Sequence, residues 1–304
     1  LVEENVGTAR DATVIGVFVF SKLSKQVLQK LPRLELIAAM STGFDHVDLS
    51  YCKKHGVSVC NVPSYGENTV AEHTFALLLA LSRKIHKAWE KTTHADFTLD
   101  GLRGWDLQGK TIGVVGTGKI GQHVIRIAKG FEMKVIAFDA FPQSELAEEL
   151  GFKYVSFNDL MRSSDVVTLH APLTPKTRHF INKRNYRLFK KNAVLINTAR
   201  GALVDTHALL AALREGVLSG AALDVLENEE AIKEEKELIY RKTIAMSREE
   251  QQTLLDEHVL LNMNNVIVTP HCAFNSIEAL QRILDTTLEN IEAFTAGKPR
   301  NKVC

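Results

Sequence analysis

The sequence predicts an α/β protein with two doubly wound parallel-sheet domains. Short apolar runs, mostly rich in Val and Ile, alternate with helical stretches along most of the chain. Such continuous apolar strands are typical of sheets that are buried on both faces. The length of 304 residues exceeds that of one ordinary hydrophobic core, and the 45% apolar and 24% charged residues match globular averages.

The N-terminal domain is expected to alternate strands with helices. Its strands are predicted over 13–20, 35–40 and 57–60, and its helices over 23–31 and 47–55. Residues 69–91 contain neither Gly nor Pro and predict one connecting helix with its start signal at Glu67-Asn68-Thr69. Residues 276–296 show helical periodicity and are expected to return to this domain.

A second α/β unit begins at Lys110. Apolar runs predict the strands of a parallel sheet at 111–115, 134–138, 165–169, 193–197, 220–223 and 265–268. The stretch 227–257 is dense in Glu and Lys and predicts a helical excursion on the surface.

Charge and cysteine usage exclude several classes of protein. Lys and Arg total 37 against 36 Asp and Glu, so neither nucleic acid nor an anionic membrane is expected as a partner. No apolar run is long enough to cross a bilayer. Four scattered cysteines form no disulfide framework, so we expect a cytoplasmic protein. The spacing of Cys52, His55 and Cys60 matches no common zinc pattern, and we expect no metal site.

A glycine-rich turn joins the first strand of the second unit to a helical stretch. Gly116-Thr117-Gly118-Lys119-Ile120-Gly121 lies between 111–115 and 122–130. Gly116 permits a tight turn, Gly118 lets the backbone approach a pyrophosphate, and Gly121 lets helix and strand pack closely. Because the helix N-terminus presents unpaired N–H groups to negative charge, the turn predicts a dinucleotide site.

The next strand, 134–138, ends on Asp139. A carboxylate at this place accepts hydrogen bonds from the adenosine ribose hydroxyls and repels a 2′-phosphate. Ala140 and Phe141 offer no arginine that would hold such a phosphate. The expected cofactor is therefore NAD rather than NADP.

Two side chains suited to hydride-transfer chemistry follow later strands. Reduction of a 2-keto acid needs a cation that binds the carboxylate and polarises the carbonyl, and an acid that exchanges the hydroxyl proton. Arg200 lies just beyond 193–197, and His271 lies just beyond 265–268. Both are therefore expected at the carboxyl edge of the sheet, where ligands bind in open α/β folds.

A carboxylate beside His271 would hold the ring in place and favour its protonated form. Glu227, Glu229 and Glu230 all lie just past the strand 220–223. The spacing alone does not choose among the three.

Several motifs together resemble the D-isomer-specific 2-hydroxyacid dehydrogenase family. They are the glycine turn, His170-Ala171-Pro172-Leu173-Thr174, Asn197-Thr198-Ala199-Arg200-Gly201-Ala202-Leu203-Val204-Asp205, Ala222-Leu223-Asp224-Val225 and Thr269-Pro270-His271. The resemblance covers nearly the whole chain. It implies a Rossmann NAD-binding domain, 67–274, inserted in a smaller flavodoxin-like substrate domain, 1–66 plus 275–304. It also implies a strand and a helix before Leu1, and a homodimer.

The resemblance also implies roles for individual residues. Arg200 would bind the substrate carboxylate and carbonyl, His271 would be the acid/base, and Glu229 would be its partner, with Glu227 a surface residue. Many members place proline directly after the glutamate, where this chain has Glu230. Asp224 would hold the nicotinamide carboxamide, and the cofactor would also be lined by Lys119, Ile120, Ala171, Pro172, Thr177, Thr198, Ala199 and Arg200. His73 would belong to the connecting helix as a structural residue.

In the first domain, the backbone of Ser41-Thr42-Gly43 would bind the substrate carboxylate, although a plain strand-to-helix turn explains these residues nearly as well. Tyr65 would line the substrate site. Phe274, three residues after His271, together with Phe20, predicts an apolar wall suited to a methyl group.

Pyruvate and D-lactate are therefore the leading substrate pair. Four alternatives stay open: a glyoxylate or hydroxypyruvate reductase, a phosphoglycerate-type dehydrogenase, an enzyme for another small anion such as formate, and an NAD-sensing corepressor of the same fold. A formate-type member of the family would have glutamine at position 229, so the glutamate found there argues against that alternative.

Overall fold

The computed structural model describes residues 5–18, 21–229 and 247–304. The chain divides into two compact units, Leu1–Gly66 with Phe274–Cys304 and Glu67–Ala273. The second junction lies one residue before the position expected from the sequence. Both units are α/β, and their strands are parallel.

The first unit carries a three-stranded sheet in the order β1-β2-β3. Its strands are β1 (Val14–Val17), β2 (Leu36–Ala39) and β3 (Ser58–Cys60), and its helices are the 3-10 helix η1 (Val6–Ala9), α1 (Lys25–Leu28), α2 (Leu49–His55) and α12 (Ile277–Thr295). α12 packs on β2, and the buried Asn290 of α12 donates to the carbonyl of Asn61 (2.8 Å). The chain end pairs antiparallel with β3 through Lys302 and Cys60. The C-terminal segment is thereby held in the first unit.

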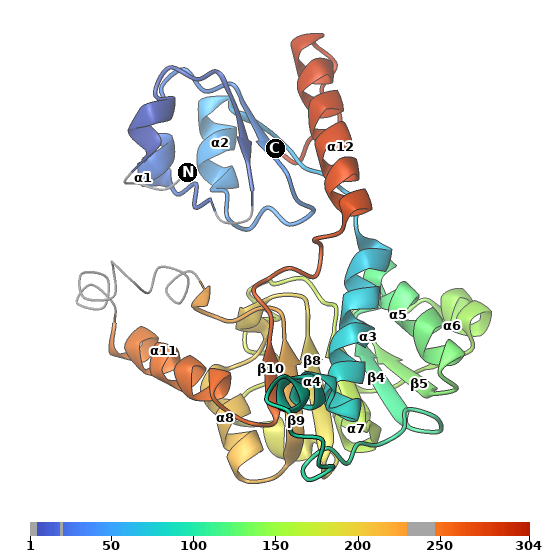
Figure 1. The fold of residues 1–304 in the computed structure, drawn as a ribbon. Coiled ribbons are helices and arrows are strands. Elements are labelled where there is room, and N and C mark those ends of the chain that lie inside the picture. The colour runs from blue at the N-terminus through green and yellow to red at the C-terminus, as the bar shows by residue number, and fades with distance from the viewer. Residues whose placement is uncertain (1–4, 19–20, 230–246) are drawn as a thin grey trace. The chain divides into compact units, whose positions relative to one another are not determined.

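The second unit carries a seven-stranded parallel sheet in the order β10-β9-β8-β7-β4-β5-β6 (Figure 1). The strands are β4 (Thr111–Val115), β5 (Lys134–Phe138), β6 (Lys153–Tyr154), β7 (Val166–Leu169), β8 (Ala193–Asn197), β9 (Leu218–Leu223) and β10 (Val266–Val268). β4 and β7 are neighbours, although the chain forms β5 and β6 between them. The strand order therefore reverses at this pair, which is where open α/β sheets bind ligands at their carboxyl ends.

Helices cover both faces of this sheet. They are α3 (Glu67–Arg83), α4 (Ile85–Thr93), α5 (Lys119–Gly130), α6 (Ser144–Leu150), α7 (Phe157–Ser163), α8 (Thr206–Arg214) and α11 (Arg248–Leu261), with 3-10 turns η2 (Tyr186–Leu188) and η3 (Gly201–Leu203). One core cluster packs α3 and α5 against the sheet, and another packs α7, α8 and α11. Burial on both faces explains why the central strands are apolar throughout.

The single connecting helix predicted over 69–91 is wrong, because the structure has two helices, α3 and α4, separated by Lys84 with φ +56°. The N–H of Trp105 donates to the carbonyl of Ser82 (3.1 Å), an acceptor that a continuing helix would use for residue 86. The returning chain at Gly104 also packs on that carbonyl. The helix therefore ends because of a tertiary contact.

The predicted excursion at 227–257 lies partly outside the described residues, which resume at Ser247. There a capping box between Ser247 and Glu250 starts α11. The two-residue strand β6 was not predicted, since two residues carry no periodicity.

Candidate active site at the carboxyl edge of the sheet

The glycine turn after β4 is packed too tightly to carry side chains at two of its positions. Gly116 has φ +96°, and a Cβ there would lie 2.7 Å from the carbonyl oxygen of His170 beyond β7. A Cβ on Gly121 would lie 2.1 Å from the carbonyl oxygen of Gly116. Any side chain at either position would clash with a backbone carbonyl, so both positions require glycine. At Gly116 the positive φ, which side chains disfavour, is a second reason. The turn is therefore fixed where β4 and β7 meet.

The N-terminus of α5 remains open in front of this turn. Gly118 is its N-cap residue and has no side chain that could cap the helix, and a Cβ at Gly118 would meet nothing within 4 Å. Lys119 forms an exposed ion pair with Glu67 (3.3 Å), while Ile120 packs against the core. Backbone N–H groups at such a terminus attract an anionic group.

Asp139 is held against the glycine turn from the end of β5. Its carboxylate accepts hydrogen bonds from the N–H (2.7 Å) and hydroxyl (3.0 Å) of Thr117 and from the N–H of Phe141 (2.9 Å). The hydroxyl of Tyr154 on β6 contacts that of Thr117 (2.8 Å). Tyr154 thus supports the Asp139 site, and no local sequence pattern marked it.

The loops after β7 and β8 are each closed by one polar side chain. The hydroxyl of Thr177 donates to the carbonyl of Pro172 (2.7 Å) and accepts from the N–H of Thr174 (2.7 Å). Thr198 is buried, and its hydroxyl contacts that of Thr74 on α3 (3.0 Å). Both threonine hydroxyls therefore already have partners within the fold, so Thr177 and Thr198 would contact a ligand through their main chain.

Arg200 stands at the N-terminus of η3, in a loop that Asn197 organises. The buried amide of Asn197 donates to the carbonyl of Arg200 (2.9 Å) and accepts from the N–H of Ala199 (3.1 Å). A Cβ on Gly201 would lie 2.1 Å from the backbone of Leu226. Gly201 therefore lets the Arg200 loop pack directly on the segment that leads to Glu229.

Asp224 holds the turn that carries His271. The main-chain carbonyl of Asp224 accepts the N–H of His271 (2.8 Å), and its carboxylate accepts the N–H groups of Cys272 (3.0 Å) and Ala273 (2.8 Å) and the hydroxyl of Thr269 (2.5 Å). Burial would raise the pKa of this carboxyl, but hydrogen bonds from His73, Thr269 and the two N–H groups outweigh it and lower the pKa. Asp224 is therefore ionised in the folded protein at neutral pH.

His271 and Glu229 form a direct pair. Nδ1 of His271 lies 2.7 Å from Oε1 of Glu229, and the two side chains are 15% and 24% exposed. His271 has φ +54°, a left-handed conformation that costs a non-glycine residue about 1 kcal/mol. The bonds from Asp224 hold the turn in this conformation and so fix the imidazole next to Glu229.

The structure distinguishes two of the three candidate glutamates, Glu227 and Glu229. Glu227 is not the surface residue that the resemblance implies, because its side chain is only 9% exposed. Its carboxylate accepts from the N–H (3.0 Å) and hydroxyl (2.8 Å) of Thr206 and lies 2.6 Å from Nε2 of His179. Glu227 therefore anchors the start of α8, and Glu230 lies outside the described residues.

In the first unit, Ser41, Thr42 and Gly43 form a braced loop after β2. The hydroxyls of Ser41 and Thr42 donate to the carbonyls of Gly43 (2.6 Å) and Val62 (2.9 Å). The amide of Asn61 donates to the carbonyl of Thr42 (2.9 Å). Because both hydroxyls are used in this way, any anion bound here would be bound by main-chain N–H groups.

The two predicted aromatic residues of the first unit are also placed. The carbonyl of Tyr65 accepts from Nε of Arg282 on α12 (2.5 Å). Phe274 packs edge to face on Phe18, with ring centroids 5.1 Å apart. Phe20, the predicted neighbour of Phe274, lies outside the described residues. Phe18 was not predicted as the partner of Phe274. In the strand predicted over 13–20 it lies two residues from Phe20, so the sequence placed both on the same face.

Comparison with known proteins identifies the family. The family described as D-isomer specific 2-hydroxyacid dehydrogenase, NAD binding domain, matches residues 75–273. The D-lactate dehydrogenase of Escherichia coli (strain K12) is 37% identical over 303 residues, which cover 98% of this chain and 88% of that protein. The chain belongs to the D-isomer specific 2-hydroxyacid dehydrogenase family.

Two further relatives are similar to this dehydrogenase over almost its whole length. The glyoxylate reductase of Thermococcus litoralis is 37% identical, over 97% of this chain and 84% of that protein. The solved structure of the D-lactate dehydrogenase from Aquifex aeolicus, complexed with NAD and lactic acid, matches with a TM-score of 0.85 and 38% identity, covering 96% of this chain and 86% of that chain. The predicted family, fold class, NAD cofactor and oxidoreductase activity are thereby confirmed.

The residues of the dehydrogenase fit the NAD that its family binds. Gly118 leaves open the space that a side chain would occupy at the N-terminus of α5, no side chain caps that terminus, and the Asp139 carboxylate is held against the same glycine turn. These features suit a pyrophosphate and an unphosphorylated ribose. Within the described residues, no helix of the dehydrogenase is long and apolar enough to cross a membrane.

A buried carboxyl group supports the loop that carries Glu229. Glu257 on α11 is fully buried, and its Oε1 accepts the N–H of Asn228 (3.0 Å), while Oε2 has no hydrogen-bond partner among the described residues. Burial raises the pKa of Glu257 from 4.5 to about 7, helped by the nearby carboxylates of Glu227 and Glu229 and opposed by the bond from Asn228. No sequence pattern marks Glu257 as a buried residue, because charged helical positions usually face solvent.

The raised pKa of Glu257 predicts a pH-dependent stability. Between 4.5 and about 7, the folded dehydrogenase holds a proton that the unfolded chain releases, so stability falls as pH rises through this range. The Glu257→Gln variant carries a neutral group at all pH values. We expect it to be more stable than the parent by up to about 3 kcal/mol at pH 8.5, and by less than about 1 kcal/mol at pH 5.

Urea unfolding at the two pH values measures this difference. The matched control is Glu249→Gln, an exposed position on the same helix, which should change stability equally at both pH values. A Glu257→Gln variant that is less stable than the parent at pH 8.5 would show that the carboxyl group is needed in its ionised form.

Proposed function

We propose that this dehydrogenase is an NAD-dependent D-lactate dehydrogenase that reduces pyruvate. The observation that carries the proposal is the 2.7 Å pair of His271 and Glu229, at the same carboxyl edge as the glycine turn and Arg200. An acid/base, a cation and a dinucleotide site at one sheet edge are what reduction of a 2-keto acid requires. The D-lactate dehydrogenases from E. coli and A. aeolicus are among its relatives.

Arg200 is proposed to bind the substrate carboxylate and to polarise the C2 carbonyl. A guanidinium group presents two parallel N–H donors to a carboxylate and stays charged at all relevant pH values. Asn197 orders the main chain of the Arg200 loop through two hydrogen bonds, and Nη1 of Arg200 donates to the carbonyl of Ala199 (2.8 Å). NADH, when bound, supplies the hydride that arrives at C2.

His271 is proposed to give its proton to the carbonyl oxygen during that transfer. Nδ1 is engaged by Glu229, so the proton leaves from Nε2 and the imidazole becomes neutral. The C2 carbon thereby becomes the hydroxyl-bearing carbon of lactate. In the reverse direction, Nε2 takes the hydroxyl proton, and Glu229 stabilises the imidazolium that forms.

The remaining predicted residues complete the proposal. The backbone of Ser41, Thr42 and Gly43 would contribute to binding of the carboxylate, with Tyr65 as a further substrate contact. The Phe274 ring, paired with Phe18, would favour a methyl substituent over a charged or hydroxylated one. Asp224 would bind the nicotinamide carboxamide in addition to holding the His271 turn.

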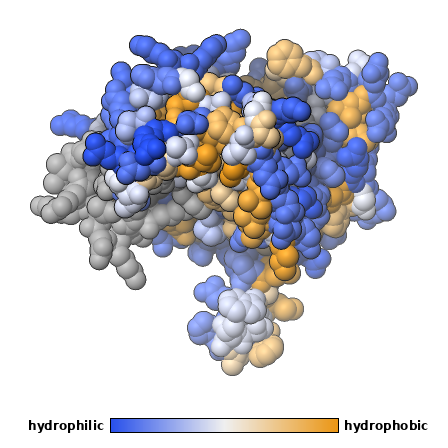
Figure 2. All heavy atoms as spheres, turned by 90° about the horizontal axis from the view of Figure 1, so that it is seen from above, coloured by the Kyte–Doolittle hydropathy of each residue, from blue (hydrophilic) through white to orange (hydrophobic). Residues whose placement is uncertain are grey.

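We further propose that the protein is a homodimer through its NAD-binding domain, in the cytoplasm. Ile85 and Trp89 on α4, with Phe97 and Leu99 just after it, are 57% to 83% exposed. Figure 2 shows apolar side chains gathered in patches among polar ones on the face drawn. Exposed apolar side chains that gather on one part of a surface often mark a protein interface. The four cysteines are free thiols, as is usual in a reducing compartment.

A steady-state screen tests the proposed substrate. NADH oxidation is followed with pyruvate, glyoxylate, hydroxypyruvate and phosphohydroxypyruvate, and the product formed from pyruvate is analysed for chirality. We expect the highest kcat/KM with pyruvate, D-lactate as the product, and neighbouring 2-keto acids weaker by about 10- to 200-fold, as one methylene or hydroxyl discriminates. A preference for glyoxylate or hydroxypyruvate contradicts the lactate assignment, and inactivity with all four acids despite NADH binding contradicts the reaction.

A further inference from the structure

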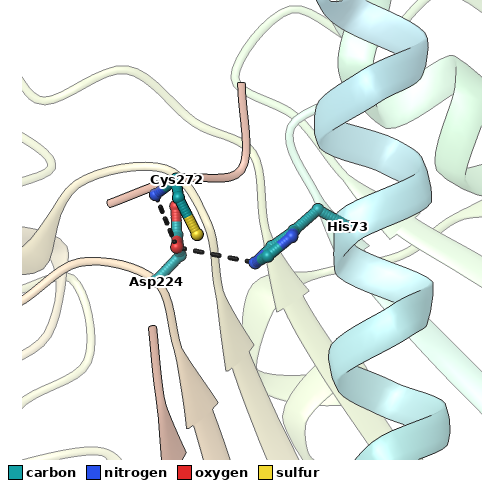
Figure 3. A group of neighbouring side chains, drawn as sticks. All are labelled: His73, Asp224 and Cys272. Atoms are coloured by element: carbon teal, nitrogen blue, oxygen red, sulfur yellow. Dashed lines mark hydrogen bonds and ion pairs between the residues drawn. The ribbon is translucent and has the colours of Figure 1, made fainter. Parts of the chain in front are cut away.

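Three side chains from distant parts of the second unit meet beside the His271 turn. His73 lies on α3, Asp224 follows β9, and Cys272 follows β10 (Figure 3). One ligand atom of each, the imidazole nitrogen, a carboxylate oxygen and the thiol sulfur, lies within 4.8 Å of the other two. Nε2 of His73 is 3.5 Å from Oδ1 of Asp224. No spacing in the sequence marks this group, because almost 200 residues separate its first and last members.

The donor set selects a class of metal ion. Nitrogen, oxygen and sulfur donors suit Zn²⁺ and similar thiophilic ions, whereas Mg²⁺ and Ca²⁺ require oxygen ligands. Ligands of a tetrahedral zinc ion lie about 3.3 to 3.8 Å apart, as bond lengths of about 2.0 to 2.3 Å dictate. The three ligand atoms now lie within 4.8 Å of one another, so side-chain rotations that move them by about 1 Å would bring them to the zinc-ligand distance. A water molecule would then complete the tetrahedron.

The charges of the three groups also fit a cation. Asp224 is buried and its carboxylate accepts hydrogen bonds from Thr269, Cys272 and Ala273, which stabilise its charged form. A thiol binds a metal ion as its thiolate, so the Cys272 proton would be released to solvent as the sulfur–metal bond forms.

We propose that His73, Asp224 and Cys272 form an inhibitory site for Zn²⁺ or a similar thiophilic divalent ion. The inhibition follows from the other bonds of Asp224. Its carboxylate accepts the N–H groups of Cys272 and Ala273, and these bonds hold the turn on which His271 stands. A metal ion on Oδ1, the oxygen next to His73, competes with the N–H of Cys272 and the hydroxyl of Thr269, and movement of the Cys272 sulfur toward the ion pulls on the residue next to His271.

Without a metal ion, the same group is a satisfied hydrogen-bond cluster. The hydroxyl of Thr269 donates to Asp224 and lies 3.2 Å from Nε2 of His73. The fold therefore does not depend on the ion. The site is one at which a metal ion switches off a protein that folds and works without it.

Two measurements on the full chain test the proposal. The first is inhibition of NADH oxidation by Zn²⁺ after removal of metals, with reversal by EDTA. The second is the absorption spectrum with Co²⁺, which shows a thiolate-to-metal charge-transfer band when a cysteine is a ligand. We expect the parent protein to show reversible inhibition and that band.

The variants are Cys272→Ser and the matched control Cys304→Ser, a half-buried thiol of the first unit. Each is compared with its own metal-free rate. Cys272→Ser should lose the charge-transfer band. It should also raise the inhibitory Zn²⁺ concentration by more than about 10-fold, because losing even a residue that only hydrogen-bonds to a metal ligand usually lowers metal affinity by about that factor. Cys304→Ser should keep both properties.

The proposal is overturned if Cys272→Ser is inhibited at the same Zn²⁺ concentration as the parent, or if the parent shows no cobalt–thiolate band. His73→Gln provides a second variant, which should also weaken Zn²⁺ inhibition. The inhibition assay depends on the dehydrogenase activity, and it uses whichever 2-keto acid is reduced fastest. The cobalt spectrum does not depend on activity, so failure of the proposed substrate leaves the metal site testable.

Discussion

Replacing Arg200 by lysine should lower kcat/KM for the 2-keto acid by about 10²- to 10³-fold, and replacing it by alanine by about 10³- to 10⁴-fold. Lysine keeps the positive charge but loses the parallel pair of N–H donors that binds a carboxylate. Alanine loses both the charge and the donors, so neither the carboxylate nor the developing charge on the carbonyl oxygen is stabilised. Both kcat and KM should change, because the same group binds the substrate and polarises it.

Steady-state kinetics and NADH titration by fluorescence measure these effects. The matched control is Arg162→Lys on α7, an exposed arginine with an ion pair to Asp159 (4.0 Å), which should leave both quantities unchanged. NADH affinity should fall far less than kcat/KM in the Arg200 variants. Equal losses of NADH affinity and turnover would show that Arg200 acts on the cofactor rather than on the substrate.

The central sheet could be predicted because each of its strands except the two-residue β6 is marked by a contiguous run of apolar residues in the sequence. Strands β4, β5 and β8 occupy 111–115, 134–138 and 193–197, the same residues that the apolar runs indicate. Sheets covered by helices on both faces require apolar residues at every position of a central strand, and this requirement leaves a clear pattern in the sequence. The carboxyl ends of these strands then place Asp139 and the Arg200 loop without further information.

Contacts between distant residues could not be predicted in this way. The break at Lys84 depends on Trp105, which approaches Ser82 only in the folded chain. Glu227 and Glu229 are equivalent to local rules, and they differ because α8 lies beside one and the His271 turn beside the other. Tyr154 likewise becomes part of the Asp139 site only through pairing of β5 with β6.

Replacing His271 by asparagine should lower kcat by about 10²- to 10⁴-fold, the usual contribution of a positioned proton donor. Asparagine is the best replacement because residue 271 has φ +54°, a conformation that asparagine tolerates better than most other residues. The turn held by Asp224 should therefore be kept while the acid is lost. NADH affinity should change little, so a parallel loss of NADH binding would contradict a role in proton transfer.

Glu229→Gln should reduce kcat less, by about 10- to 100-fold, since glutamine keeps a hydrogen-bonding group near Nδ1 but not the charge that stabilises the imidazolium. Glu229 touches His271 (2.7 Å) and is proposed to act through it. In the His271→Asn background, the same Glu229→Gln change should therefore cost almost nothing, because residues that act as one unit are not additive. A full additional loss in the double variant would mean that Glu229 contributes to the reaction independently of His271.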